Sequence, residues 1–130
     1  MNIKELTRGY ITAALWSSTG DDGEPLDATH GPEDLAPETR ATMEKDCLEF
    51  MGQRNRIDLE IYEDQRAIPI DAEYTASDCA GHDFWLTRNG HGAGFWDRDL
   101  GELGDRLTDA ANKFGEVNLY IGDDGKVYQY

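Results

Sequence analysis

Basic residues are scarce in this sequence. The 130 residues include 12 Lys and Arg against 27 Asp and Glu, which gives a formal net charge of −15. A protein that binds nucleic acid directly needs a basic patch to neutralise phosphates, and an anionic membrane surface attracts the same charge. The composition therefore argues against direct nucleic-acid binding and against membrane binding. Long-range attraction favours basic protein partners instead.

Cysteine and long apolar runs are also scarce. The two cysteines, Cys47 and Cys79, have no CxxC spacing, so free, reduced thiols are expected. No run approaches the ~18 apolar residues of a membrane span. The N-terminal stretch MNIKELTRGY lacks the apolar centre of a secretion signal. These absences together predict a cytoplasmic protein.

The acidic residues are concentrated in the first two thirds of the chain. Residues 21–78 hold 17 acids and five bases, whereas residues 79–130 hold nine acids and five bases. Closely spaced carboxylates can imitate the phosphates of DNA, or they can form a solvated surface that keeps the protein soluble. The candidate partner-binding face consists of Asp21, Asp22, Glu24, Asp27, Glu33, Asp34 and Glu38.

Apolar periodicity predicts helices in the first half of a single domain spanning residues 1–130. Residues 2–17 carry an apolar stripe at three-to-four spacing. The glycine- and proline-rich stretch 18–37 predicts a long loop, which either is a functional surface or packs through Leu26 and Leu35. Helix and loop therefore alternate at the start of the chain.

Two further segments continue this helical half. Pro37 suits the first turn of a helix that Gly52 ends. Residues 55–65 fit a helix or a strand, and their many charges favour a helix. A connector is expected over residues 67–81, with a short helical turn at its end that Thr75 caps and Gly81 closes.

The last third predicts a ββαββ unit. The stretch HDFWLTR alternates and is rich in strand formers, NGHGAG is typical of a hairpin turn, and GFWD continues as a second strand. Residues 99–114 have a helical stripe that Asp97 or Asp99 can cap. EVNLYIG and KVYQY form a closing hairpin around DDG. The fold class is therefore α+β, with N-terminal helices packed on a small antiparallel sheet.

The block GHDFWLTRNGHGAGFWDR at residues 81–98 gathers the residue types that chemistry uses. Aromatic rings with convergent polar groups suit a small-molecule pocket. The candidate pocket residues are His82, Trp85, Arg88, His91, Trp96 and Asp97. The alternative is that the glycines serve a tight hairpin and that the three tryptophans, Trp16 included, supply core area.

Specific chemistry in this block is weakly indicated. His91 with Asp97, or Asp97 with Asp99, are the acid–base candidates. His82 and His91 have no HxxxH or HExxH spacing, so no metal site is expected. No nucleophile has a recognisable setting, and no catalytic residue or cofactor is assigned.

Three tyrosines lie near the end of the chain. Tyr120, Tyr128 and Tyr130 fall on or beside the last predicted hairpin. They form either an exposed interface patch or part of the packing of the sheet.

Residues 79–130 resemble a family of small tailed-bacteriophage proteins. The resemblance is carried by a GHDFWLTRNGHG-GFWDR box, a Gly- and Leu-rich helix and a DLY-GDDG-like ending, and YITAALWSSTGDDGEPLD resembles the family's opening. It covers residues 9–51 and 79–130 and leaves 52–78 unmatched. No activity or catalytic residue is assigned to that family, so the resemblance implies only an accessory phage protein in the cytoplasm of an infected bacterium.

The sequence favours a non-enzymatic protein that acts by binding another protein. A basic host protein, such as a defence or nucleic-acid-binding protein, is the partner that the charge favours. The alternative is a small-molecule-binding protein or a small enzyme with a pocket at the 82–98 hairpin.

Overall fold

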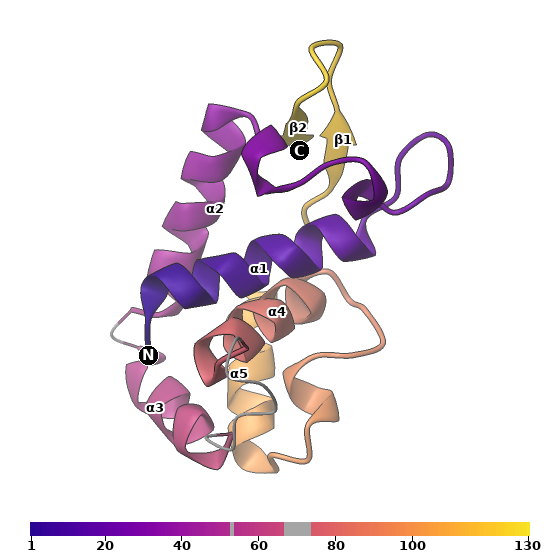
Figure 1. Ribbon diagram of the computed structural model, residues 1–130. Helices are drawn as coiled ribbons and strands as arrows, with labels where there is room; N and C mark the ends of the chain where they lie inside the picture. Colours follow the sequence, from indigo (N-terminus) through magenta and orange to yellow (C-terminus); the bar gives the residue numbers. More distant parts are fainter. Residues whose placement is uncertain (53, 67–73) are drawn as a thin grey trace.

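The computed structural model describes residues 1–52, 54–66 and 74–130, and the following bounds refer to these ranges. In chain order the elements are α1 (Ile3–Ser17), the 3₁₀ turns η1 (Leu26–Ala28) and η2 (Pro32–Asp34), α2 (Pro37–Phe50), α3 (Arg56–Gln65), α4 (Ala76–Arg88), η3 (Phe95–Asp97), α5 (Glu102–Asn112), β1 (Leu119–Ile121) and β2 (Val127–Gln129). Helices dominate, and a small antiparallel sheet lies at the C-terminal end (Figure 1). The α+β class is therefore confirmed.

The centre of the molecule is the crossing of α1 and α4, which are far apart in the sequence (Figure 1). Two glycines bring their backbones together. A Cβ atom added to Gly81 would overlap the Leu6 carbonyl oxygen and lie 2.7 Å from the Tyr10 amide nitrogen. A Cβ atom added to Gly9 would overlap the Asp78 carbonyl oxygen. The two helices can therefore lie this close only with glycine at both positions.

The strand predicted for HDFWLTR is wrong, because these residues are the second half of α4. Thr75 begins the helix as predicted: its hydroxyl accepts from the Asp78 amide at 3.3 Å, and the Asp78 carboxylate accepts from the Thr75 amide at 3.0 Å. Gly81 does not close the helix, which continues for seven more residues to Arg88. Its small size serves the crossing with α1 instead.

The Asn-Gly pair that suggested a hairpin turn ends α4. Gly90 has a φ of 68°, and its amide donates to the Thr87 carbonyl at 3.1 Å. The His91 amide donates to the Leu86 carbonyl at 3.0 Å. This pair of bonds is a Schellman motif, which uses a left-handed glycine just as a tight hairpin does.

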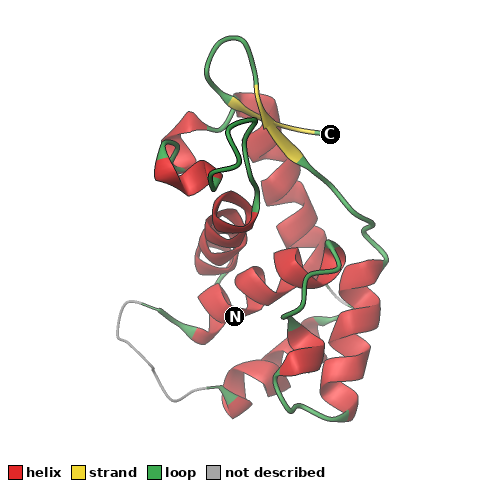
Figure 2. Ribbon diagram, turned by 90° about the vertical axis from the view of Figure 1, so that its right-hand side faces the viewer, coloured by secondary structure: helices red, strands yellow, loops and turns green. Residues whose placement is uncertain are grey.

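The rest of the predicted ββαββ unit is confirmed only in its second half. GFWD forms the 3₁₀ turn η3 and not a strand. Helix α5 is present, but its N-cap is Gly101 and not Asp97 or Asp99. The closing hairpin is present, with Tyr120 opposite Tyr128 in the antiparallel register (Figure 2).

The other helical predictions agree with the structure. Helix α1 begins at Ile3, Pro37 is the first residue of α2, and the ambiguous segment 55–65 forms α3. Residues 67–73 of the predicted connector lie outside the described residues. The loop between α1 and α2 packs through Leu26 and Leu35, which are both buried.

The core lies where α1, α2, α4 and η3 meet. Phe50 of α2 stacks on Phe84 of α4 with ring centroids 4.1 Å apart. Tyr10 of α1 packs against Phe84 at 5.1 Å and meets Trp85 edge-on at 5.2 Å. Offset and edge-on arrangements of this kind stabilise aromatic pairs beyond the area that they bury.

Candidate functional site

The predicted pocket at residues 82–98 does not form as a hairpin, because its first half is helical. His82, Trp85 and Arg88 lie on α4, whereas Trp96 and Asp97 lie on η3. His82, Trp85 and Arg88 follow one another at three-residue spacing along α4, but they contact different partners, which are Trp16, Ser17 and Asp46.

Arg88 is a structural residue at the end of α4. Its guanidinium is buried and donates to the carbonyls of Phe114 and Gly115 at 2.9 and 2.8 Å. It also donates to the Tyr10 hydroxyl at 3.0 Å and to the Asp46 carboxylate at 2.8 Å. The planar donor fork of arginine is thereby engaged with four partners. Arg88 joins four segments and has little capacity left for a ligand.

Trp85 and His82 also face other helices. The Trp85 indole is almost fully buried and donates to the Ser17 hydroxyl at 2.7 Å. The His82 ring packs on Trp16 with centroids 5.9 Å apart. Burial lowers the pKa of His82, so its neutral form is favoured at neutral pH.

The core role expected for the tryptophans holds for Trp85 alone. Trp16 and Trp96 are 55% and 53% exposed. Both side chains therefore lie at the surface and not in the core.

The acid–base candidates remain on the surface. His91, Asp97 and Asp99 are exposed. The contacts of the described residues include no hydrogen bond between His91 and Asp97. Within residues 1–52, 54–66 and 74–130, no group of three His, Cys, Asp or Glu residues is arranged to hold a metal ion.

His91 and Trp85 meet at the edge of a polar cleft of about 420 Å³. Sequence reasoning missed its other lining residues, which are Ser17, Ser18, Thr19, Asn89, Glu116, Val117, Asn118, Leu119 and Tyr130. Several of these polar groups are already paired. The Asn89 amide donates to the Trp85 carbonyl at 3.0 Å and accepts from the Val117 amide at 2.9 Å. No sequence motif marks this cleft, because it joins three distant segments.

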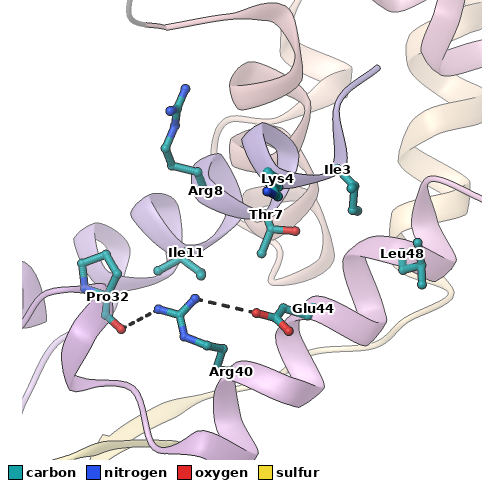
Figure 3. Close-up of a pocket in the computed structure, with 9 residues that line it drawn as sticks. All are labelled: Ile3, Lys4, Thr7, Arg8, Ile11, Pro32, Arg40, Glu44 and Leu48. Atoms are coloured by element: carbon teal, nitrogen blue, oxygen red, sulfur yellow. Dashed lines mark hydrogen bonds and ion pairs between the residues drawn. The ribbon is translucent and has the colours of Figure 1, made fainter.

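An apolar groove of about 720 Å³ lies between α1 and α2 (Figure 3). Its lining residues are Ile3, Lys4, Thr7, Arg8, Ile11, Pro32, Arg40, Glu44 and Leu48. Arg40 crosses the groove, where it donates to the Pro32 carbonyl at 2.8 Å and pairs with Glu44 at 3.8 Å. Arg8 is hydrogen-bonded to Asp78 at 2.8 Å. The groove can accept apolar side chains, but Arg8, Arg40 and Glu44 in its lining are engaged in structural contacts.

The buried titratable groups also have structural roles. Asp83 accepts from Arg98 at 2.8 Å and from the Tyr62 hydroxyl at 2.9 Å. Burial raises the pKa of Cys47 to about 12, so its thiol is not a nucleophile at neutral pH.

The acidic segment, defined here as residues 21–38, has the largest concentration of unpaired charge. The predicted carboxylates Asp21, Asp22, Glu24, Asp27, Glu33 and Glu38 are all exposed. Asp34 is half-buried and accepts from the Gly31 amide at 2.8 Å. None of the seven takes part in an ion pair with another described residue, and the stretch from residue 9 to residue 39 contains no Lys or Arg.

Acidic residues elsewhere are frequently paired. Ion pairs join Arg8 to Asp78, Arg40 to Glu44, Lys45 to Glu49, Arg88 to Asp46, Arg98 to Asp83 and Arg106 to Asp58. None of these ion pairs involves a carboxylate of the acidic segment, which presents its charge directly to solvent.

The acidic segment is held in place by the hairpin and by its own backbone. The His30 ring is hydrogen-bonded to the Gly125 carbonyl at 3.0 Å, and the Ala36 amide donates to the Val127 carbonyl at 2.9 Å. Within the loop, the Gly20 amide donates to the Glu24 carbonyl at 3.0 Å. These bonds connect the carboxylates to an ordered part of the fold.

Comparison with known proteins finds no significant match for the chain among family models, curated proteins or solved structures. Within the described residues, no helix has the length and apolarity that crossing a bilayer requires.

Proposed function

We propose that this protein acts by binding a basic protein through the acidic segment, as an accessory phage protein in an infected bacterium. The observation that carries the proposal is the set of exposed carboxylates that form no ion pair with another described residue. Such a surface attracts positively charged partners and accelerates their association. The DNA- or RNA-binding face of a host protein is the kind of surface that complements it.

The position of the acidic segment also supports this proposal. The Ala36 amide and the His30 ring bind the hairpin at Val127 and Gly125, so the backbone of the segment loses little further freedom when a partner binds. Pre-organisation of this kind reduces the entropic cost of association. The alternative of a pocket at an 82–98 hairpin has less support, because the hairpin is absent and Arg88 is engaged in the core.

A quantitative pull-down tests the proposal. The full chain is immobilised, a bacterial lysate is applied at 50 and 500 mM KCl, and the captured proteins are measured by mass spectrometry. We expect a basic protein to be captured at low salt and released at high salt, because counter-ions screen exposed charges. The test variant has the substitutions Asp21→Asn, Asp22→Asn, Glu24→Gln, Asp27→Asn, Glu33→Gln and Glu38→Gln.

A second variant controls for the change in net charge. It neutralises six exposed carboxylates outside the acidic segment, with the substitutions Glu60→Gln, Asp64→Asn, Asp97→Asn, Asp99→Asn, Asp105→Asn and Asp109→Asn. The proposal requires that the first variant lose the partner and the control retain it. Equal loss in both variants, or capture that is insensitive to salt, would contradict it.

A further inference from the structure

The solvent face of the hairpin carries exposed tyrosines. Tyr120 is 46% exposed and Tyr130 is 70% exposed. Tyr120 stacks on Tyr128 with centroids 5.6 Å apart and meets Tyr130 edge-on at 5.3 Å. Of the two alternatives that the sequence left open, exposure at the surface holds for Tyr120 and Tyr130, whereas Tyr128 is half-buried. Their rings hold one another in place while parts of their faces remain open to solvent.

A cleft of about 610 Å³ separates this tyrosine face from the acidic segment. Its lining residues are Thr19, Gly20, Asp21, Asp22, Glu24, Pro25, Leu26, Thr29, Leu119, Tyr120, Ile121 and Tyr130. We call it the tyrosine–carboxylate cleft. It has aromatic rings from the hairpin on one side and carboxylates from the loop on the other.

The two walls of the cleft are held close together. A Cβ atom on Gly20 would lie 4.0 Å from the Ile121 side chain, and Leu26 at the base of the loop is buried. The loop itself is closed by hydrogen bonds from the Gly20 amide to the Glu24 carbonyl and from the Leu26 amide to the Ser18 carbonyl, at 3.0 and 2.9 Å. The cleft therefore exists before any partner binds.

The cleft runs along one edge of β1. Leu119 and Ile121 alternate with Tyr120 along β1, so they lie on the opposite face of the strand, and all three line the cleft. Strand β2 pairs with β1 on the other edge. A second hollow, of about 530 Å³, shares Tyr120 and Ile121 with the cleft and is otherwise lined by residues 122–124 of the hairpin turn and by Tyr128 of β2. The concave surface thus extends past Tyr120 towards Asp123 and Asp124.

We propose that the tyrosine–carboxylate cleft binds an arginine or lysine side chain from an extended basic segment of a protein partner. This inference rests on the proposed function and assigns the contact that anchors the partner. Charge complementarity selects this occupant, because no Lys or Arg is found among the lining residues, whereas Asp21, Asp22 and Glu24 are. An acidic or phosphorylated segment would be repelled by the same carboxylates.

The aromatic wall adds selectivity for a cation. The face of a tyrosine ring attracts an ammonium or guanidinium group, and arginine also stacks on it. The carboxylates of the opposite wall neutralise the charge of the bound side chain. The stem of the side chain can pack on Leu26 and Ile121, as long basic side chains do on apolar surfaces.

Direct binding of a defined peptide to the full chain tests this inference. The probe is a fluorescein-labelled nine-residue peptide, Gly-Ser-Arg-Gly-Arg-Gly-Ser-Gly-Ser, and its counterpart has citrulline in place of both arginines. We expect the arginine peptide to bind at 150 mM KCl and to shift the ring resonances of Tyr120 and Tyr130 in NMR spectra. The citrulline peptide keeps the shape but lacks the charge, so we expect its affinity to fall at least tenfold.

Ring variants separate aromatic contact from charge. The double variant Tyr120→Leu, Tyr130→Leu keeps the carboxylates but lacks the ring faces, and we expect it to bind about threefold to tenfold more weakly. The double variant Tyr120→Phe, Tyr130→Phe keeps the ring faces, and we expect its affinity for the arginine peptide to be close to that of the unsubstituted protein. Because both positions are exposed, we expect both variants to fold, and circular dichroism checks this.

The outcomes distinguish this inference from the proposed function. Equal affinity of the arginine and citrulline peptides, or unchanged affinity of the leucine variant, overturns the cleft as the anchor. If the leucine variant still captures the lysate partner but the acidic-segment variant does not, the proposed function stands and the cleft assignment fails. If the peptide behaves as expected but no basic protein is captured from the lysate, the cleft binds cations and the proposed function fails.

Discussion

At the scale of single residues, buried charges are structural and exposed charges are available for binding. Arg88 and Asp83 are among the most deeply buried charged residues, and each is paired with an opposite charge. Asp78 follows the same rule. Burial alone would raise its pKa, but the hydrogen bonds from Arg8 and Thr75 outweigh burial and lower it. Its contribution to stability is therefore present above the ordinary carboxyl pKa and is lost as the pH falls through the lowered value.

Replacement of Arg88 by methionine tests the structural role of this residue. The change leaves the Phe114 and Gly115 carbonyls without their donor and leaves the Asp46 carboxylate without its cation. We expect the free energy of unfolding in urea to fall by about 3–5 kcal/mol, as when a buried pair loses one partner.

The matched control for Arg88 is Lys45→Met. Lys45 forms an exposed pair with Glu49 at 4.0 Å, so we expect its removal to change stability by less than about 1 kcal/mol. If Arg88→Met lowers the free energy of unfolding only slightly, the structural role is contradicted and Arg88 is again a candidate ligand-binding residue.

At the scale of elements, the sequence predicted helices well where one face is buried and poorly where all faces are buried. Helices α2 and α5 carry apolar stripes and were found at the expected places. In α4 the six residues from Asp83 to Arg88 are all buried, so no polar face reveals a helical period. The aromatic and β-branched residues Phe84, Trp85 and Thr87 are typical of a strand.

The two candidate sites also differ in how well the sequence predicted them. The acidic segment was predictable because exposed charge in a loop can be read directly from the sequence. The tyrosine–carboxylate cleft was not, because it depends on the packing of residues 19–29 against residues 119–130. Contacts between segments so far apart leave no local pattern in one sequence.

The crossing of α1 and α4 predicts that Gly81→Ala lowers the free energy of unfolding, although the same change stabilises an isolated helix. Alanine is a better helix former than glycine by roughly 0.5–1 kcal/mol, so an isolated helix would become more stable. In the protein the added methyl group would overlap the Leu6 carbonyl oxygen and push the helices apart. We expect the variant to lose about 3 kcal/mol or more of unfolding free energy, as overpacked cores do.

Gly92→Ala is the control for this crossing. A Cβ atom at Gly92 would meet nothing within 4 Å, so its stability should change by less than about 1 kcal/mol. Urea unfolding of the two variants measures both effects. A stabilised Gly81→Ala protein would mean that the helices do not touch through their backbones.

At the scale of the whole molecule, seven of the 27 acidic residues lie in the acidic segment, which contains no Lys or Arg. The segment is joined to the hairpin by the hydrogen bond between the His30 ring and the Gly125 carbonyl. Like charges that are concentrated in this way repel one another in the folded state, and added salt screens the repulsion.

The melting temperature should therefore rise with salt. Between 20 and 200 mM KCl we expect an increase of about 4 °C, which corresponds to roughly 1 kcal/mol for a domain of this size. The variant that neutralises the acidic segment should melt higher at low salt and respond less to added salt. Differential scanning calorimetry measures both, and a melting temperature that is independent of salt would mean that repulsion in the segment is negligible.

The pairing of α1 with α4 also sets the order of events during synthesis. Residues 18–75 must be made after α1 before α4 begins, which takes several seconds at roughly 5–20 residues per second. Throughout this interval the side of α1 that packs on α4 has no native partner. The nascent chain is therefore exposed to chaperones and proteases until most of it has been translated, and its folding is slower than the high helix content alone suggests.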